Sequence, residues 1–531
     1  MTPTAEQQDI LNGFETIRNN IKVLALAGTG KTSTLLELVA AHPKTKFLYL
    51  AFNRAIKGEV EAKAKARGIR NLRVATQNSF CLEHAKSAGC KCQNIRGYMS
   101  VKDTCNRLGL TGNDRYLAYP AFQIMTRFMV SADREMTIKH IPHEVEDRFE
   151  TQVRRFNKNA QESKILIEID KRKKSALNIA RRLFDSFDFS SDIMLHDVYV
   201  KLVQLHHDKI SIAEEVVLLD EAQDINPVFA DIASKIQTFF ISPLTKNKTI
   251  IDTRMIAVGD SNQAIYQFRG AQDFLKDMPA EATFTLTQSF RFTPEIADKT
   301  NLLLEHMTDL RIKGFEDVEK DDSEAILCRS NMGCLAEAFS MLEQEKPFVL
   351  DGGVDNEGFK MIEDIVALHN NDTYSVQHPD LKGIRNFHEF EMEIEQEMLN
   401  KEWKTALRVI DKIGGFEQAI DSLRKLKDSQ RRVPKNAIVI TTMHKSKGKE
   451  WNTVHIADDA EKVFYTSDMD ESGRKVRIPI PFSEAPVTEK NLFYVAVTRA
   501  KRNLELGLCS RLFSSEDANT ANTTNNLSVA A

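Results

Sequence analysis

Apolar and polar positions follow two alternating patterns along the first 80 residues of this 531-residue chain. Segments that are apolar at nearly every position indicate buried strands, and segments with apolar residues every three or four positions indicate helices. In chain order the pattern predicts a strand over 21–26, a helix over 31–41, a strand over 47–52, a helix over 54–66 and a strand over 72–76. This alternation is typical of a parallel sheet covered by helices on both faces.

The same pattern is then interrupted twice by long helical segments. Strand signals vanish over 81–207, return at 216–219 and 255–258, and begin a second block with strands at 283–287 and 325–329. Residues 356–432 are helical again, and strands return at 437–441 and 453–457. We therefore predict the α/β class, with two parallel-sheet domains that each carry a mainly helical insertion. A tail from 513, rich in Asn, Thr, Ser and Ala, is expected to be disordered.

The charge and the cysteine content limit which cellular compartment and which kind of nucleic-acid-binding surface we expect for this protein. Charged residues make up 28% of the chain, but the net charge is only −4, so any nucleic-acid path must be a local basic surface. Seven cysteines without paired spacing predict reduced thiols. The beginning of the chain resembles no signal peptide, and no run of about 18 apolar residues exists. We expect a soluble intracellular protein, in the cytoplasm or nucleus, that does not contact a membrane.

The most basic stretch lies in the first insertion. Its cations are Arg154, Arg155, Lys158, Lys164, Lys171, Arg172, Lys173, Lys174, Arg181 and Arg182. A solvated helix face explains such a stretch, and so does a contact with nucleic acid or a localisation signal.

Glycine-spaced residues follow the first strand and open the first helix. The segment reads Ala27-Gly28-Thr29-Gly30-Lys31-Thr32. In a phosphate-binding loop of this kind, backbone N–H groups and the helix N-terminus face the phosphates, the Lys reaches the β and γ phosphates, and the Thr binds Mg²⁺. The general pattern begins with Gly where this chain has Ala25. These residues predict a nucleotide site without identifying its reaction.

Two carboxylates follow the predicted strand over 216–219. They are Asp220 and Glu221, in the segment Asp-Glu-Ala-Gln-Asp. At the carboxyl edge of a parallel sheet, Asp220 can hold the Mg²⁺ that Thr32 also binds, and Glu221 can orient and deprotonate a water. Hydrolysis of a bound nucleotide is the reaction that these residues favour.

Together these motifs resemble superfamily 1 helicases. The block over 258–271, which includes Gln263 and Tyr266-Gln267-Phe268-Arg269-Gly270, resembles the third motif of the UvrD/Rep/PcrA branch, and further blocks follow in the family order at 288–291, 327–331, 441–451 and 493–501. The resemblance covers about Gln7 to Leu506. The local sequences around the phosphate loop and over Ala51-Phe52-Asn53-Arg54 are similar to those of the F-box DNA helicase family. We expect no N-terminal F-box, because the chain has no room for one.

The resemblance implies two RecA-like motor domains. It assigns 1–80 and 208–280 to motor domain 1A, 81–207 to its insertion 1B, 281–355 and 433–512 to motor domain 2A, and 356–432 to a short insertion 2B. It further implies ATP and Mg²⁺ as cofactors, and single-stranded and tailed duplex DNA as partners. The implied activity is translocation from 3′ to 5′ with unwinding, in replication, repair or recombination alongside unidentified proteins of those pathways.

Residue roles at the nucleotide follow from the same resemblance. Arg291 and Arg499 match the two arginines that reach ATP from the second domain, and Gln263 matches the γ-phosphate sensor. Gln7 matches the residue that reads adenine, Phe290 an aromatic that stacks on it, and Glu450 a ribose contact. Ser33 stands where bacterial members carry an Arg that stacks on adenine, which weakens one wall of the base site.

A DNA track is implied in the same way. Its residues would be Phe52, Asn53, Thr76, Asn78, Tyr266, Phe268, Arg269 and His444. Basic groups and aromatic faces hold single strands, although each aromatic could instead belong to the core. Asn78 replaces the usual family His, so a strand contact there is less secure.

Two other functions fit the same residues. One is an RNA-directed superfamily 1 motor, and the other is a translocase or nucleotide-dependent scaffold that strips proteins from DNA without processive unwinding. Intact Glu221, Arg291 and Arg499 favour an active ATPase in every case.

Overall fold

The computed structural model describes residues 3–513 except 98, 100, 158–159, 242–247, 379–380, 382–383, 396–398, 400, 432 and 470–474. Lys158 and residues 514–531 of the predicted tail lie outside the described residues. Contacts divide the chain into two units. The first comprises Met1–Ala25 and Gly30–Leu286, and the second comprises Leu26–Thr29 and Thr287–Ala531.

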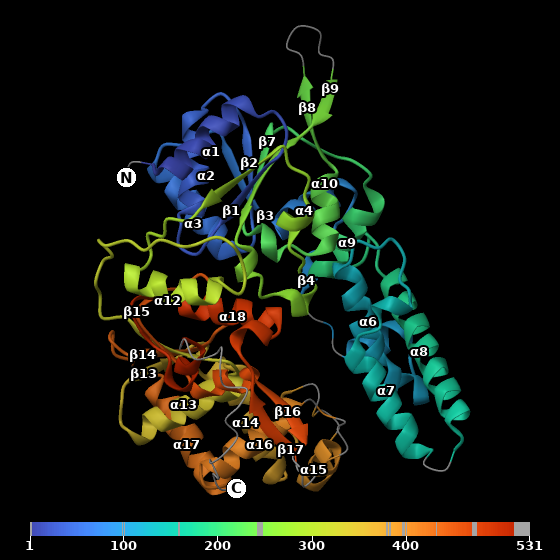
Figure 1. Cartoon of the computed structure of the whole chain (residues 1–531). Helices are drawn as coiled ribbons and strands as arrows, with labels where there is room; N and C mark the ends of the chain where they lie inside the picture. The colour runs from blue at the N-terminus through green and yellow to red at the C-terminus, as the bar shows by residue number, and fades with distance from the viewer. Residues whose placement is uncertain are drawn as a thin grey trace. The chain divides into compact units, whose positions relative to one another are not determined.

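A six-stranded sheet forms the centre of the first unit, with strand order β11-β1-β10-β7-β2-β3 (Figure 1). Every neighbouring pair is parallel. The strands are β1 (Ile21–Ala25), β2 (Phe47–Ala51), β3 (Leu72–Thr76), β7 (Val216–Leu219), β10 (Arg254–Gly259) and β11 (Ala282–Leu286). Helices α1 (Ala5–Thr16), α2 (Lys31–Ala41) and α3 (Arg54–Ala66) contribute to the core on one face of this sheet. The predicted α/β class and its parallel sheet are confirmed.

The strand expected over 283–287 belongs to a different sheet from the one we predicted. We placed it at the start of the second sheet, but β11 pairs with β1 at the edge of the first, with Val23 opposite Phe284. Phe284 packs against α1 so closely that a Cβ on Gly13 would lie 2.3 Å from its ring. The prediction was wrong because an edge strand with one buried face carries no signal of which sheet it joins.

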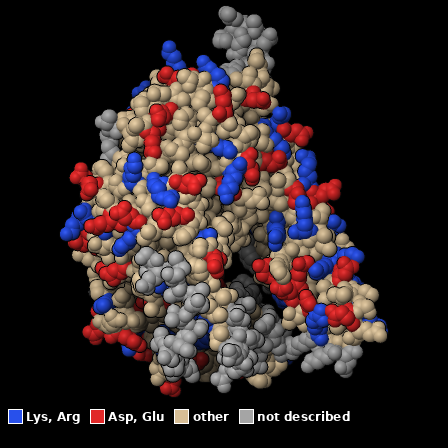
Figure 2. Space-filling model, viewed as in Figure 1, with Lys and Arg blue, Asp and Glu red and all other residues tan. Residues whose placement is uncertain are grey.

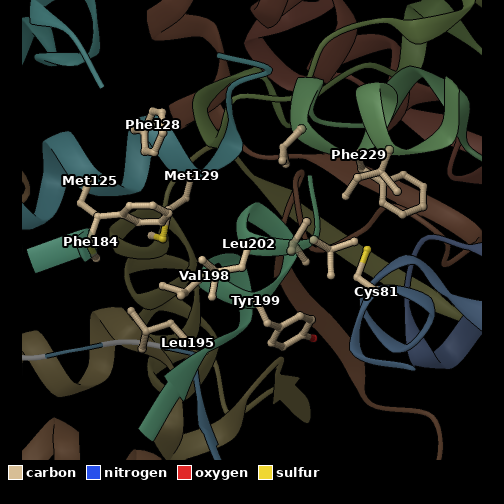
Figure 3. Close-up of a cluster of buried hydrophobic side chains, with 14 of the residues drawn as sticks. Cys81, Met125, Phe128, Met129, Phe184, Leu195, Val198, Tyr199, Leu202 and Phe229 are labelled. Atoms are coloured by element: carbon tan, nitrogen blue, oxygen red, sulfur yellow. The ribbon is translucent and has the colours of Figure 1, made fainter. Parts of the chain in front are cut away.

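The first insertion packs on the opposite face of the same sheet. Leu48 of β2 and Leu219 of β7 share one hydrophobic core with residues of the insertion helices. Figure 3 shows part of this core, where Met125 and Phe128 lie near Phe184, and Val198 lies beside Leu202. The helices are α4 (Gln77–Ser87), α5 (Val101–Leu108), α6 (Ala118–Val130), α7 (His143–Phe156), α8 (Glu162–Asp185) and α9 (His196–His206).

Five short strands of the first unit escaped the sequence prediction. Within 81–207, β4 (Asn94–Arg96) and β5 (Ile193–Leu195) form a parallel pair of three residues each. Beyond it, β6 (Ile210–Ile212), β8 (Ile236–Ile241) and β9 (Lys248–Asp252) form a small separate sheet. The expectation that strands vanish over 81–207 was wrong because a three-residue strand has no measurable periodicity. Helices α10 (Pro227–Ser234) and α11 (Phe274–Asp277) complete this unit.

The second unit is built on a five-stranded parallel sheet with the order β13-β14-β12-β15-β18. Its strands are β12 (Glu324–Cys328), β13 (Phe348–Leu350), β14 (Ile438–Thr442), β15 (Trp451–Ile456) and β18 (Ala500–Glu505), with helices α12 (Pro294–Leu304), α13 (Asn331–Glu343) and α18 (Val487–Val497). The described part of 356–432 is mainly helical, as predicted, with α14 (Glu357–His369), α15 (Phe387–Glu395), α16 (Lys401–Lys412) and α17 (Phe416–Ser429). An antiparallel pair, β16 (Tyr465–Met469) and β17 (Lys475–Pro479), precedes α18.

Two chemical expectations can be compared with the described residues. All seven cysteines are free and buried. No helix in the described ranges has both the length and the apolar character needed to cross a membrane.

Candidate functional site

The predicted phosphate loop joins β1 to α2. Gly28 and Gly30 have φ of 73° and 79°, a left-handed conformation that favours glycine. Gly30 is the N-cap of α2 and provides no side-chain cap, so the first N–H groups of the helix are left for a ligand. Ala25, which replaces the first glycine of the general pattern, is the last residue of β1 and is buried in the core.

The two predicted magnesium ligands are joined by a tyrosine that our sequence reasoning missed. The Tyr49 hydroxyl donates to Oδ2 of Asp220 at 2.5 Å, and the Thr32 hydroxyl hydrogen-bonds Tyr49. The backbone N–H of Glu221 donates to Oδ1 of Asp220 at 2.9 Å. Burial and the neighbouring Glu221 raise the pKa of Asp220 to about 6, and burial raises the pKa of Tyr49 well above its ordinary value. Both oxygens of Asp220 are thus oriented by the protein.

This donor set fits Mg²⁺. A hydroxyl and a carboxylate held together match the hard oxygen ligands that Mg²⁺ prefers, and this ion is usually bound by one or two carboxylates together with substrate phosphates. The described residues contain no group of three His, Cys, Asp or Glu side chains arranged for a metal.

A hydrogen-bonded chain leads from the predicted water-activating carboxylate to the predicted γ-phosphate sensor. Gln223 Nε2 donates to Oε2 of Glu221 at 2.5 Å, and Gln223 Oε1 accepts from the backbone N–H of Asp260 at 3.1 Å. Gln263 Nε2 then donates to Oδ2 of Asp260 at 2.7 Å. Lys31 Nζ lies 3.5 Å from Oε1 of Glu221, which adds the phosphate loop to the same network.

Two backbone features hold this chain in place. Glu221 has φ of 51°, a left-handed conformation that is uncommon for a residue with a side chain. A Cβ on Gly259 would lie 2.2 Å from Oε1 of Gln223, so only glycine permits the close approach of β10 to this side chain. The carboxylate and the amide are therefore positioned by the main chain as well as by hydrogen bonds.

The aromatic residues of the predicted DNA track form a continuous row. The Phe52 and Tyr266 rings stack with centroids 5.5 Å apart, and Tyr266 and Phe268 follow at 6.3 Å. The Arg269 guanidinium lies 5.8 Å from the Tyr266 ring and 5.5 Å from that of Phe268. Phe268 is 68% exposed, which is unusual for a large apolar side chain.

The polar members of that track have mixed surroundings. Asn53 caps α3 by accepting from the N–H of Ile56, and Thr76 is a buried cap of α4 that shares a capping box with Ser79. Asn78 lies exposed in the first turn of α4. His444 follows β14 in the second unit.

Both predicted arginines of the second unit form hydrogen bonds with two short segments, 449–450 and 495–498. Arg291 Nε donates to Oε2 of Glu450 at 2.8 Å, and its NH1 donates to the Thr498 carbonyl at 3.3 Å. Arg499 is 1% exposed and donates to the carbonyls of Val495 and Lys449 at 2.8 and 3.3 Å. Glu450, the predicted ribose contact, is therefore paired with Arg291 here.

The second unit also includes four residues of the phosphate loop, Leu26–Thr29. The Phe290 N–H donates to the Gly28 carbonyl at 2.9 Å, and the Ala27 N–H donates to the Tyr494 hydroxyl at 3.2 Å. The Phe290 ring packs edge-on against Phe315. Phe290 and the loop backbone are thus neighbours, and the role of its ring at adenine stays a prediction.

Gln7 is placed beside the first turn of α2. It forms a capping box with Thr4 at the start of α1, and its Nε2 donates to the Thr34 hydroxyl at 3.0 Å. Ser33, also in the first turn of α2, is half-buried.

Comparison with known proteins places this geometry in a family. The model of the UvrD/REP helicase N-terminal domain matches residues 4–277, more than half of the chain. The chain belongs to the UvrD/REP helicase family. It is 26% identical to F-box DNA helicase protein 1 of Schizosaccharomyces pombe, over 95% of this chain and 57% of that protein. It is 27% identical to F-box DNA helicase 1 of Gallus gallus, over 94% of this chain and 48% of that protein.

A bacterial relative matches a smaller part. DNA helicase II of Haemophilus influenzae is 30% identical over 35% of this chain and 25% of its own length. The chain spans about half the length of the F-box relatives that it matches.

Four cations of the basic stretch of this UvrD/REP family member are paired with acidic residues of its own helices. Arg154 contacts Glu150 and Glu162 at 2.8 and 2.7 Å, and Lys173 contacts Glu146 at 2.5 Å. Lys174 and Arg172 form similar pairs with Asp170 and Glu168. Figure 2 shows the same interspersion of both charges over the visible face. For these four cations, a solvated helix face explains the charge better than a phosphate-binding surface does.

Three positioning residues of the site were absent from our sequence expectations. Gln223 and Asp260 stood inside quoted motifs, and their chemistry as hydrogen-bonding links could have been inferred from that position. Tyr49 gave one weak signal, a hydroxyl in an otherwise apolar run over 47–51. A buried Tyr usually needs a partner, but the sequence does not say which.

Proposed function

We propose that this protein hydrolyses ATP with Mg²⁺ to move from 3′ to 5′ along single-stranded DNA and to unwind duplex ahead of it. The observation that carries the proposal is the hydrogen-bonded chain from Glu221 through Gln223 and Asp260 to Gln263. Two residues beyond Gln263 the main chain reaches Ile265, and the next residue is Tyr266, the middle member of the aromatic row. The carboxylate that acts on water is thereby linked to residues suited to stack on bases.

In the nucleotide site, each residue has a distinct role. The loop residues Ala27, Gly28, Thr29 and Gly30 would bind phosphate oxygens through their N–H groups, and Lys31 would bind the β and γ phosphates. Thr32 and Asp220 would hold Mg²⁺, which supplies charge that stabilises the transferring phosphoryl group. Glu221 would orient the attacking water and accept its proton. Gln7, Ser33, Phe290 and Glu450 would surround the base and ribose.

Arg291 and Arg499 would stabilise the transition state. An arginine placed on the transferring phosphoryl group is worth about 10³–10⁵ in rate. Because both lie in the second unit, delivery of their charge would depend on the position of that unit, and this dependence would couple hydrolysis to movement. Gln263 would sense the γ-phosphate and link the nucleotide site to the DNA track.

The DNA track would hold successive bases on Phe52, Tyr266 and Phe268. Stacking of a base on an aromatic side chain contributes about 1–3 kcal/mol, and Arg269 adds charge for the phosphates. Asn53, Thr76, Asn78 and His444 would contact the backbone of the strand. The names of the relatives, both DNA helicases, favour DNA over RNA.

We extend the proposal to the domain division and the cellular role. The boundaries 1–80, 81–207, 208–280, 281–355, 356–432 and 433–512 remain our proposal for the parts 1A, 1B and 2A, 2B, with one correction. Because β11 (Ala282–Leu286) belongs to the first sheet, 1A would extend to Leu286 and 2A would begin after it. An intracellular protein of replication, repair or recombination, acting with proteins of those pathways, fits a DNA motor. The small insertion over 356–432 would impose weaker autoinhibition than a larger one.

The test is an unwinding assay on tailed duplexes with 3′ or 5′ overhangs, made of DNA or RNA, with and without ATP. We expect unwinding only of DNA with a 3′ overhang and only with ATP. Lys31→Ala should abolish ATPase while the far-UV CD spectrum stays unchanged.

Each other outcome contradicts a defined part of the proposal. Preference for a 5′ overhang would reverse the polarity, and equal unwinding of RNA would favour the RNA-directed motor. DNA-stimulated ATPase that displaces a bound protein without unwinding would favour the strand-stripping translocase. ATPase retained by Lys31→Ala would refute the phosphate-loop assignment.

A further inference from the structure

A cavity of about 660 Å³ lies in the first unit, at the edge of the sheet opposite the phosphate loop. Two connections form most of its wall, the one between α2 and β2 and the one between α3 and β3. Both enter the amino ends of their strands, whereas the phosphate loop leaves the carboxyl end of β1. The cavity is therefore separate from the proposed nucleotide site.

Cations dominate its lining. Five are present, Lys44, Lys46, Arg67, Arg70 and Arg73, against one carboxylate, Glu214. In a protein whose net charge is −4, five cations around one cavity are a strong local concentration.

The cations differ in how far they are neutralised. Arg73 is paired with Glu214 at 2.6 Å and with Glu83 at 2.9 Å, and Arg67 is paired with Glu37 at 3.1 Å. No salt bridge within the described ranges involves the other three, Lys44, Lys46 and Arg70, which are all exposed. Three cations are thus left to face an anionic ligand.

One side chain holds the cavity wall in shape. Asn71 Nδ2 donates to the carbonyls of Thr45 and His42 at 2.8 and 2.9 Å, and to that of Val39 at 3.3 Å. The Asn71 carbonyl in turn accepts from the Phe47 N–H at 2.9 Å. These bonds tie the segment with Arg70 to the segment with Lys44 and Lys46, so the backbone that carries the three cations is ordered before a ligand arrives. A preformed site loses less entropy on binding.

Gly68 leaves the mouth open. It lies in the cavity lining with φ of 69°, and a Cβ added there would meet no atom within 4 Å. The space beside it is therefore available to a ligand.

We propose that this cavity is a second phosphate-binding site, which takes a phosphodiester backbone or a free oligophosphate. Several cations around one concave surface match the closely spaced charges of either source. The site would hold nucleic acid, or a small polyanion, away from the motor track and independently of ATP hydrolysis.

Lysine footprinting on the full chain tests the proposal. The protein is acetylated briefly, alone, with a 20-bp DNA duplex, and with sodium tripolyphosphate, and each lysine is quantified by mass spectrometry. We expect Lys44 and Lys46 to be protected at least threefold by one of the two probes, and Lys65 and Lys86, exposed lysines outside the cavity, to react unchanged.

Matched variants test the same site by affinity. Lys44→Ala/Lys46→Ala/Arg70→Ala should lower the affinity for the protecting probe at least tenfold, and reduce the slope of log K against log[salt] by about 2–3 for duplex. Arg18→Ala/Lys65→Ala/Lys86→Ala removes the same charges outside the cavity and should change neither. Basal ATPase should be equal in both variants, which shows that they fold.

The outcomes separate the two ligand sources. Protection by duplex alone supports a nucleic-acid backbone, and protection by tripolyphosphate alone supports a small oligophosphate. Protection by neither probe, or an equal loss of affinity in both variants, overturns the proposal. Absence of helicase activity in the wild-type protein would refute the proposed function without affecting this site.

Discussion

The Tyr49 hydroxyl donates to Asp220 at 2.5 Å in the interior of the first unit, and the same tyrosine hydrogen-bonds Thr32. One side chain therefore orients both proposed ligands of Mg²⁺. Partners of metal ligands commonly matter by about 10–100-fold in metal affinity. We expect Tyr49→Phe to weaken fluorescent ADP binding about tenfold in Mg²⁺ and to leave binding in EDTA unchanged.

A second buried tyrosine provides the control for that variant. Tyr199 is 1% exposed and bonds to His196 in the insertion, so Tyr199→Phe removes a buried hydroxyl away from the nucleotide. Equal Mg²⁺ dependence in the wild type and Tyr49→Phe would show that Tyr49 only supports packing.

Gln223→Ala should uncouple hydrolysis from DNA. The amide links Glu221 to Asp260, and its loss breaks the chain to Gln263. We expect stimulation of ATPase by poly-dT to fall at least fivefold, with KM for ATP within twofold of the wild type. Gly259→Ala should act similarly, because its Cβ would displace Gln223. A fall in basal rate equal to the fall in stimulated rate would assign Gln223 to the chemical step alone.

Phe268→Ala should weaken single-strand binding. Loss of one stacking face costs about 1–3 kcal/mol, which is roughly 5–150-fold in Kd. Fluorescence anisotropy with a labelled dT oligonucleotide measures this change, and basal ATPase should remain. Tyr374, at 97% exposure, lies outside the proposed track, so Tyr374→Ala is the matched loss of an exposed aromatic. If both variants bind DNA as the wild type does, Phe268 is not part of the track.

Arg499→Lys should reduce turnover by orders of magnitude with little change in ATP affinity. Lysine keeps the charge but lacks the planar fork that donates to Val495 and Lys449, so its ammonium cannot take the same position. Single-turnover hydrolysis measures the effect, and a thermal melt within 3 °C of the wild type serves as the folding control. A rate within twofold of the wild type would transfer the role to another arginine.

Lys201 gives a pH dependence of stability. This α9 side chain is fully buried, donates to the Ser131 carbonyl at 3.0 Å and also contacts the Asp133 carbonyl. Burial lowers the pKa of Lys201 to about 7 from its ordinary 10.5, although Asp133 and Asp231 oppose the shift. Between pH 7 and 10.5 the unfolded chain binds the proton that the folded chain has lost, so the free energy of unfolding rises with pH.

The corresponding measurement is urea unfolding at pH 7, 8 and 9. Lys201→Met should flatten the rise with pH relative to the wild type. The two lost hydrogen bonds should also lower its stability at pH 9, by about 1–3 kcal/mol. Parallel pH profiles in the two proteins would show that Lys201 keeps its proton in the folded state.

The sequence predicted those parts of the fold whose signal is local. Helix α2 begins at Lys31 and ends at Ala41, as its periodicity predicts, and β3 spans 72–76 as expected. A glycine turn marks the start of α2, and a mainly apolar run marks β3. The strand near Thr283 was assigned to the wrong sheet because strand pairing is a long-range property.

The site was predictable to the extent that its residues stand in contiguous motifs. Glu221 and Gln263 could be named from the sequence, but the links between them could not be traced. The bond from Gln223 to Asp260 joins residues 37 positions apart, and Tyr49 meets Asp220 across 171 positions. Such pairs depend on strand order, which places β2 beside β7 and β7 beside β10.

The shared core of the first unit has a consequence for how this protein can be shortened. Because Leu48 and Leu219 of the sheet are covered by the helices of the first insertion, that segment does not behave as a removable module. A truncated chain that lacks 81–207 would expose an apolar face of the sheet and should aggregate when expressed. Substitutions at the ends of these helices that lie away from the sheet should be tolerated. Substitutions at helix residues that share the core with β2 and β7 should be tolerated only together with changes in those strands.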